Sequence, residues 1–98
     1  MRMKRRLGLL FAIAILALAL PAQALGASVS SNCGAGALFR TSGRADNWQD
    51  HVHGGVLVHH YYIGTQQLKH TNWGWRVGPQ NATVTGPNLS SASAICIF

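Results

Sequence analysis

The stretch VLVHHYYIGTQQLKHTNWGWRV, residues 56–77, decides the fold class. Val56–Ile63 is a run of β-branched and aromatic residues with the length of a strand. Gly64–Leu68 turns the chain, and Thr71–Val77 then alternates with a period of two, as in a strand. This alternation places one set of side chains on a single face: Thr71, Trp73, Trp75 and Val77.

The chain on both sides of this stretch carries similar signals. Three further strands are predicted, at Ala35–Arg40, Asn81–Thr85 and Ser93–Phe98. Ala82 and Val84 should face inward, and Gly43–Asp50 is predicted to be a loop. After residue 24 the chain has no Glu or Met and little helical periodicity. We therefore expect an all-β domain, a small antiparallel β-sandwich or an open barrel, after an N-terminal signal helix.

The N-terminal segment has the three-part order of a secretory signal peptide. Met1–Arg6 is basic, Leu7–Leu20 is fourteen residues without a charge or a hydrogen-bonding side chain, and Ala22-Gln23-Ala24 fits a cleavage site. The alternative is an uncleaved anchor, but a membrane-spanning helix needs about 20 apolar residues. We predict a signal peptide at residues 1–24 and an exported, extracellular domain at residues 25–98, with Gly26 or Ala27 as alternative cleavage points.

Removal of the signal peptide changes the charge of the protein. It takes away four of the eight basic residues and leaves four basic against two acidic ones, a net charge of +2. Nucleic-acid binding needs a clustered basic face, so we expect no nucleic-acid partner. We also expect no stable membrane span after cleavage.

The two cysteines, Cys33 and Cys96, lie near the ends of the predicted exported domain. A domain of 74 residues has a small hydrophobic core and usually needs a stabilising cross-link, such as a disulfide. Export implies an oxidising compartment, so we predict a Cys33–Cys96 disulfide, worth about 4 kcal/mol in the chain-entropy model. Two buried free thiols and intermolecular pairing are the alternatives.

Histidines are the candidate metal ligands. His51 and His53 share a face of an extended segment, and His70 is a third candidate. Three imidazoles suit zinc or copper. No Cys or Glu stands at metal-ligand spacing, so solvent-exposed histidines are the favoured interpretation, and we expect no cofactor.

Aromatic residues are the candidate binding surface. Trp73 and Trp75 share a predicted face, Tyr61 and Tyr62 lie nearby in sequence, and Arg76 should point away from the tryptophan pair. Such a face can stack on sugar rings or anchor a protein at an interface. The competing interpretation, favoured in so small a domain, is that the two tryptophans form the core.

Catalytic residues are scarce. Asp46 and Asp50 are the only carboxylates, and no nucleophile with a base and an orienting group is visible. We therefore expect no enzymatic activity.

Ala82-Thr83-Val84-Thr85-Gly86-Pro87-Asn88-Leu89-Ser90, followed by Ala92-Ser93, resembles the end of the lactococcin 972 family of secreted bacteriocins. The strand rich in Tyr and His that leads to Lys69-His70 resembles the middle of that family. The resemblance implies a small β-sandwich that acts, without being an enzyme, on the envelope of susceptible bacteria. The chain departs from the family in having two cysteines, and in having Ile95, Cys96 and Ile97 where the family has aromatic residues. No functional residue is carried over.

Two functions remain open from the sequence. The first is a bacteriocin-like antibacterial protein that acts at an anionic cell envelope through its strand aromatics and its mildly cationic, His-rich surface. The alternative is an extracellular or envelope module that binds a glycan, a metal or another protein.

Overall fold

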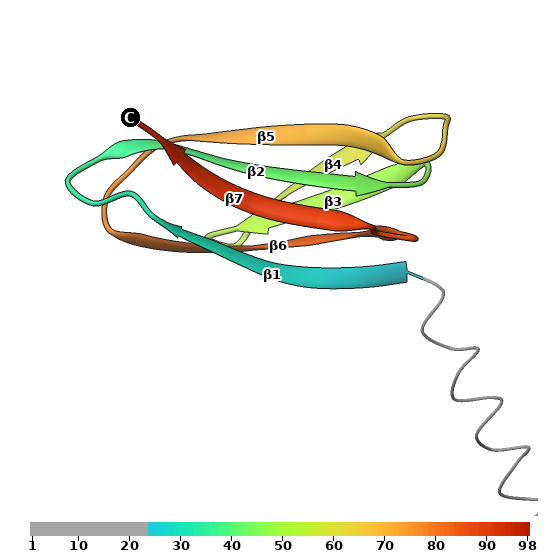
Figure 1. The fold of residues 1–98 in the computed structure, drawn as a ribbon, viewed down its shortest axis with the longest axis horizontal. Coiled ribbons are helices and arrows are strands. Elements are labelled where there is room, and N and C mark those ends of the chain that lie inside the picture. The colour runs from blue at the N-terminus through green and yellow to red at the C-terminus, as the bar shows by residue number, and fades with distance from the viewer. Residues whose placement is uncertain (1–23) are drawn as a thin grey trace, which may run out of the picture.

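The computed structural model describes residues 24–98 (Figure 1). The predicted signal peptide lies outside the described residues, apart from Ala24. The described chain forms seven strands: β1 (Ala24–Asn32), β2 (Ala37–Ala45), β3 (Trp48–His53), β4 (Val56–Tyr61), β5 (Gln67–Arg76), β6 (Pro79–Pro87) and β7 (Ser91–Ile97). Within residues 24–98 there is no helix of the length and apolarity that crossing a membrane requires.

The strands build two antiparallel sheets that pack face to face (Figure 1). The first sheet has the order β1-β6-β3-β4, and the second has the order β5-β2-β7. The predicted all-β, antiparallel fold is therefore confirmed.

Alternating burial explains why the second sheet packs as it does. Along its central strand β2, every odd-numbered residue is buried: Ala37, Phe39, Thr41, Gly43 and Ala45. The even-numbered side chains point outward, as the pleat of a strand requires. In β6, Ala82 and Val84 are buried, as the sequence predicted.

The prediction of a loop at Gly43–Asp50 is wrong. Strand β2 continues to Ala45 and β3 begins at Trp48, so only Asp46 and Asn47 lie between them. The inward positions of this segment are Gly43, Ala45 and Gln49, of which only Ala45 has an apolar side chain, so the apolar alternation that marks a half-buried strand is missing. A methyl group on Gly43 would lie 2.6 Å from Oε1 of Gln49, so the glycine makes room for a buried amide.

The predicted disulfide is confirmed. Cys33 follows β1 of the first sheet and Cys96 lies in β7 of the second, and their Cα atoms are 5.2 Å apart. The bridge thus ties the two sheets together across the core. The buried apolar cluster consists of Cys33, Ala37, Phe39, Ala82 and Cys96, with Val29, Trp73 and Ala94 packed against it.

Candidate functional surfaces

A β-bulge in β5 separates the two tryptophans that the sequence placed together. Phe39 lies opposite Gly74 and Arg40 lies opposite Asn72, so Trp73 has no partner on β2. Gly74 has a φ of +88°, which a glycine adopts without steric cost. The extra residue reverses the alternation, and the prediction that Trp73 and Trp75 share a face is wrong.

Trp73 belongs to the interior and Trp75 to the surface. The indole N–H of Trp73 donates a hydrogen bond of 3.0 Å to Oγ1 of Thr41, inside the sandwich. Trp75 is 62% exposed and lies beside Leu38 of β2 on the outer face. A Cβ atom on Gly36 would lie 2.3 Å from the Trp75 ring, so the indole rests against the backbone at Gly36.

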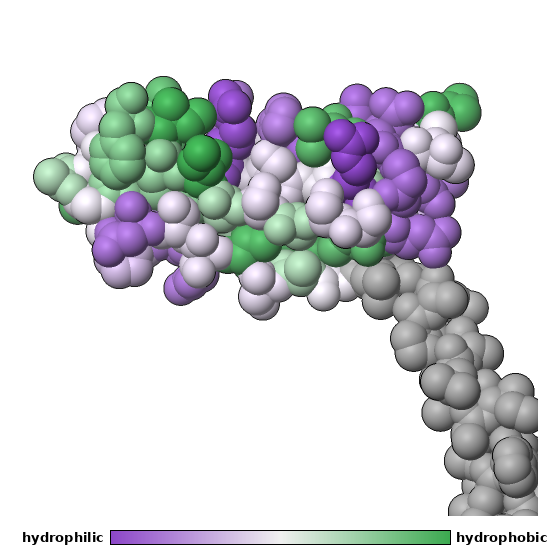
Figure 2. Space-filling view, viewed as in Figure 1, coloured by the Kyte–Doolittle hydropathy of each residue, from purple (hydrophilic) through white to green (hydrophobic). Residues whose placement is uncertain are grey.

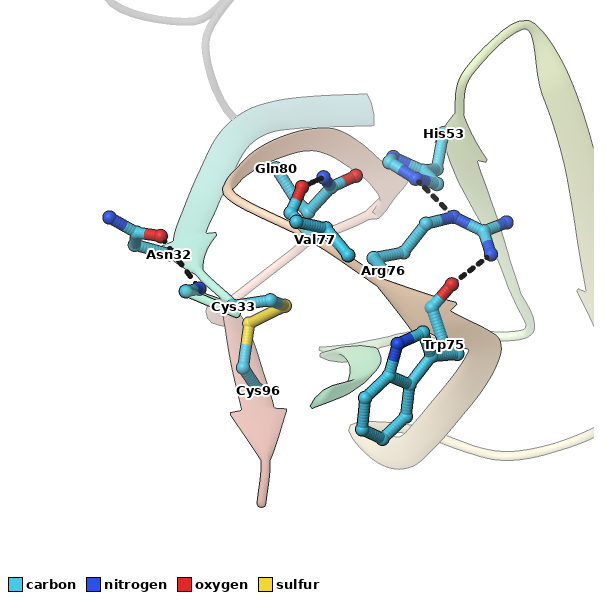
Figure 3. Close-up of a disulfide and its surroundings, with 9 residues drawn as sticks. Asn32, Cys33, His53, Trp75, Arg76, Val77, Gln80 and Cys96 are labelled. Carbon is cyan, nitrogen blue, oxygen red and sulfur yellow. Dashed lines mark hydrogen bonds between the residues drawn. A yellow bond between two sulfur atoms is a disulfide. The ribbon is translucent and has the colours of Figure 1, made fainter. Parts of the chain in front are cut away.

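An apolar patch surrounds Trp75 at the end of the molecule that carries the disulfide. Its exposed members, hereafter the apolar end, are Leu38, Trp75, Val77, Ile95 and Phe98. Figure 2 shows green, hydrophobic residues gathered at this end, where β7 finishes, and mostly polar ones at the other end. Figure 3 shows the Trp75 side chain near the Cys33–Cys96 bridge.

Charged side chains are divided unequally between the two sheets. All four basic residues of the described chain lie in the second sheet, Arg40 and Arg44 in β2 and Lys69 and Arg76 in β5. None of β2, β5 and β7 contains Asp or Glu. The second sheet is therefore cationic, and the strands of the first sheet contain no Lys or Arg.

Arg40 and His70 are held on the outer face of the second sheet by its own polar residues. Arg40 Nε donates to Oδ1 of Asn72 at 2.7 Å, and Nδ1 of His70 lies 2.6 Å from Oγ of Ser42. Within residues 24–98 the only ion pair joins His59 to Asp50, so no carboxylate pairs with Arg40. Arg40 and Arg44, four residues apart on the outward face of β2, form a cationic row that extends from the apolar end.

The three candidate metal ligands do not come together. His51 and His53 point between the sheets, whereas His70 is exposed on the outside of the second sheet. Within residues 24–98 no three His, Cys, Asp or Glu side chains are placed to hold one metal ion. The structure therefore does not form the three-histidine site that the sequence suggested.

His51 instead occupies the centre of a buried polar network. Its Nε2 lies 3.0 Å from Oε1 of Gln49, which can only accept, so Nε2 carries the hydrogen. Its Nδ1 then accepts from the hydroxyl of Thr41, at 2.7 Å. Burial, followed by the neighbouring His60 and His70, lowers the pKa of His51 to about 4, although Asp50 acts in the opposite direction. The neutral imidazole is therefore the form that the fold accommodates.

Tyr61 and Tyr62 lie on opposite faces of the first sheet. The hydroxyl of Tyr62 donates to the carbonyl of Ala45 at 2.6 Å and accepts from Gln49, which makes it part of the interior network. Tyr61 is 76% exposed on the outer face. Because Trp75 is exposed on the other sheet, the aromatic residues predicted to bind together form no single site.

Arg76 follows Trp75 in β5 and contacts a histidine of β3 and the backbone of its own strand. Its Nε is 3.4 Å from Nε2 of His53, and its Nη1 donates to the carbonyl of Trp75 at 2.8 Å (Figure 3). Its side chain therefore leaves β5 on the inner side, opposite to Trp75, as its pairing with the buried Ala37 requires.

The sequence analysis missed a second aromatic group, on the outer face of the first sheet. Trp48 of β3 pairs with Tyr61 of β4, and Asp50 pairs with His59 two residues further along. The alternation of Trp48 and Asp50 was a usable signal, but it fell within the segment predicted to be a loop.

Comparison of the chain with protein-family models, with curated proteins and with solved structures finds no match.

Proposed function

We propose that this chain is a secreted, non-enzymatic antibacterial protein of the bacteriocin type that acts at the envelope of susceptible bacteria. The observation that carries the proposal is the outer face of the β5-β2-β7 sheet, which combines the apolar end with a cationic row. The resemblance of residues 82–93 to the lactococcin 972 family supports the same conclusion.

The apolar end has the composition of a surface that enters a membrane interface. Trp75 presents a large ring with a polar N–H, a combination that favours the boundary between headgroups and acyl chains. Leu38 and Phe98 add exposed apolar area beside it, and Phe98 is 87% exposed. Contiguous exposed apolar patches usually mark an interaction site.

The basic residues of the second sheet favour an anionic target. Each Lys or Arg near an anionic lipid surface contributes about 1 kcal/mol of attraction. Arg40 lies closest to the apolar end, because it follows Leu38 by two residues on the same outward face of β2, whereas Arg76 points toward His53 on the inner side. We infer that the protein lies on an anionic membrane surface with the apolar end inserted and Arg40 at the headgroups.

The surroundings of Asp46 and Asp50 do not favour a catalytic pair of carboxylates. Asp46 accepts hydrogen bonds from Asn88 and Gln66, which lower its pKa. Asp50 is bonded to His59 on the outer face of β3 and β4. Each carboxylate has its own partners, which favours a binding role over hydrolysis.

Growth inhibition tests the proposal. Purified, oxidised residues 24–98, which contain all seven strands, are applied to a panel of Gram-positive strains. We expect inhibition at micromolar concentration, and binding to vesicles that contain phosphatidylglycerol but not to vesicles of phosphatidylcholine alone. Absence of inhibition on every strain would contradict the antibacterial role.

A matched pair of variants locates the activity. Trp75→Ala removes the largest side chain of the apolar end, and we expect it to weaken both vesicle binding and growth inhibition about tenfold. Ile63→Ala removes a side chain that is 91% exposed in the β4–β5 connection, at the other end of the molecule, and should change neither (Figure 1). Equal effects of the two changes would show that the apolar end has no special role.

A further inference from the structure

The outer face of the first sheet carries a compact group of aromatic and polar side chains. The ring of His59 lies 6.0 Å from that of Trp48 and 6.4 Å from that of Tyr61, with planes within 28° of parallel. Nδ1 of His59 is hydrogen-bonded to Oδ1 of Asp50, which fixes the imidazole between its neighbours. The other carboxylate oxygen of Asp50 and Nε2 of His59 have no partner among the described residues.

A hollow of about 360 Å³ continues the same face toward the β3–β4 turn. Its lining includes Val52 of β3 and the polar side chains of Ser28, Ser30, Asn81 and Thr83. Trp48, Asp50 and Val52 alternate outward along one strand, so the aromatic group and the edge of the hollow lie about 13 Å apart. Together they form one surface with rings at one end and hydroxyl and amide groups at the other.

This surface differs in charge from the proposed membrane-binding face. The strands of the first sheet contain no Lys or Arg, and Asp50 is their only acidic residue. An anionic ligand would find no cation of the Lys or Arg type here. A neutral ligand with several hydroxyl groups fits both the charge and the donors and acceptors available.

We propose that the outer face of the first sheet binds the neutral pyranose units of an extracellular glycan. A pyranose has an apolar face of C–H groups and an edge of hydroxyls. The rings of Trp48 and Tyr61 contact the C–H face, which is the usual role of large, rigid aromatic side chains at such sites. The free oxygen of Asp50 accepts hydrogen bonds from sugar hydroxyls, and Nε2 of His59 offers a further position.

The hollow contacts the following sugar units of the same chain. Its serine and threonine hydroxyls and the amide of Asn81 can each donate and accept, as recognition of hydroxyl groups requires. The span of about 13 Å from Trp48 to Val52 exceeds a single sugar ring, so the site favours oligosaccharides over monosaccharides.

Titration with defined oligosaccharides tests the proposal. Tetramers of β-1,4-linked N-acetylglucosamine and of β-1,4-linked glucose are titrated into the purified, oxidised protein by calorimetry, with an oligogalacturonate of similar length as the anionic probe. We expect saturable binding of at least one neutral tetramer, and binding of the anionic oligomer at least about tenfold weaker. No saturable heat from either neutral tetramer at millimolar concentration would overturn the proposal.

Variants then separate binding from a purely structural role of the aromatic group. Tyr61→Ser and Trp48→Ala should each weaken binding of the neutral tetramer about tenfold. Tyr61 is 76% exposed, so its replacement keeps the fold even if that of Trp48 does not. Unchanged affinity in Tyr61→Ser would assign the rings to sheet stability alone and overturn the site.

The matched control is Trp75→Ala on the other sheet, which should bind the tetramer with unchanged affinity. This variant also keeps the sugar proposal distinguishable from the antibacterial one. Loss of growth inhibition in Trp75→Ala with sugar binding intact would show two independent surfaces. Loss of sugar binding in Trp75→Ala would move the glycan site to the second sheet and so contradict this assignment.

Discussion

The hydroxyl of Thr41 in β2 lies 2.7 Å from Nδ1 of His51 in β3 and joins the two sheets through a hydrogen bond in the interior. The same oxygen accepts the indole N–H of Trp73. Both Thr41 and His51 are fully buried. The centre of this sandwich is therefore polar, and its stability depends on keeping every member of the network paired.

The network is closed at its other end by Gln49. Its amide nitrogen donates toward the carbonyls of Gly43 and Gln67 and toward the hydroxyl of Tyr62, while its oxygen accepts from His51. Within residues 24–98 every buried side-chain nitrogen or oxygen has a hydrogen-bond partner. A fully satisfied network of this kind specifies one packing of the two sheets.

Acid should destabilise the protein through His51. Its pKa is lowered from 6.5 to about 4 in the folded state, so the unfolded chain binds the proton more readily between these values. Stability is then fully present above about pH 6.5 and falls as the pH drops toward about 4. We expect a loss of about 2 to 3 kcal/mol between pH 7.5 and pH 4.5, measured by urea unfolding.

His60 acts in the same direction, because burial and then Lys69 lower its pKa as well. His51→Gln should flatten the dependence of unfolding free energy on pH, since it removes the most strongly affected group. Equal stability of the unmodified protein at pH 7.5 and pH 4.5 would show that the interior accepts the charged imidazole.

Replacement of Thr41 by Val should be costly although the two side chains have the same shape. The change leaves Nδ1 of His51 and the N–H of Trp73 buried without partners. Each lost partner costs about 1 to 3 kcal/mol, so we expect a decrease of at least about 2 kcal/mol in the free energy of unfolding. Thr83→Val, on the exposed face of β6, is the control and should stay within about 0.5 kcal/mol of the unmodified protein. A similar small effect of Thr41→Val would show that the network contributes little.

Reduction of the disulfide should lower the melting temperature. Cys33 and Cys96 are 63 residues apart, and cross-linking a loop of this length restricts the unfolded chain by about 4 kcal/mol. Thermal unfolding followed by circular dichroism, with and without dithiothreitol, measures the effect. The double variant Cys33→Ala/Cys96→Ala should melt, with or without dithiothreitol, at the temperature of the reduced unmodified protein. If dithiothreitol left the melting temperature of the unmodified protein unchanged, the bridge would not stabilise the fold.

The fold class followed from the sequence because alternation in β5 and β6 and the β-branched run of β4 are local properties. The pairing of Cys33 with Cys96 was predicted from the expected oxidising compartment and from the presence of only two cysteines in the chain. Strand β1 was missed because Ala24–Asn32 contains mostly small and polar residues and carries little apolar alternation. Its strand conformation depends on pairing with β6 along its whole length, a non-local property.

The candidate sites were harder to predict because both depend on register. A single unpaired residue, Trp73, reverses which face of the sheet each later side chain of β5 points to. Gly74 was a usable signal, since an isolated glycine within a strand often marks a bulge. The group around Trp48 needed the pairing of β3 with β4, which places His59 opposite Asp50 although the two are nine residues apart.

Replacement of Gly36 by Ala should displace Trp75 and thereby test whether its fixed position matters. The new methyl group would lie 2.3 Å from the indole ring, and the φ of +145° at this position is strained for any residue with a Cβ atom. We expect the ring to move away from the backbone, with a change in tryptophan fluorescence and weaker binding to anionic vesicles. Gly54→Ala is the matched control, because Gly54 also has a positive φ, of +56°, but has no atom near its would-be Cβ. The control should lose about 1 kcal/mol of stability through the backbone alone and keep its vesicle binding. If Gly36→Ala and Gly54→Ala bound anionic vesicles equally well, the contact between Trp75 and the backbone at Gly36 would not contribute to membrane binding.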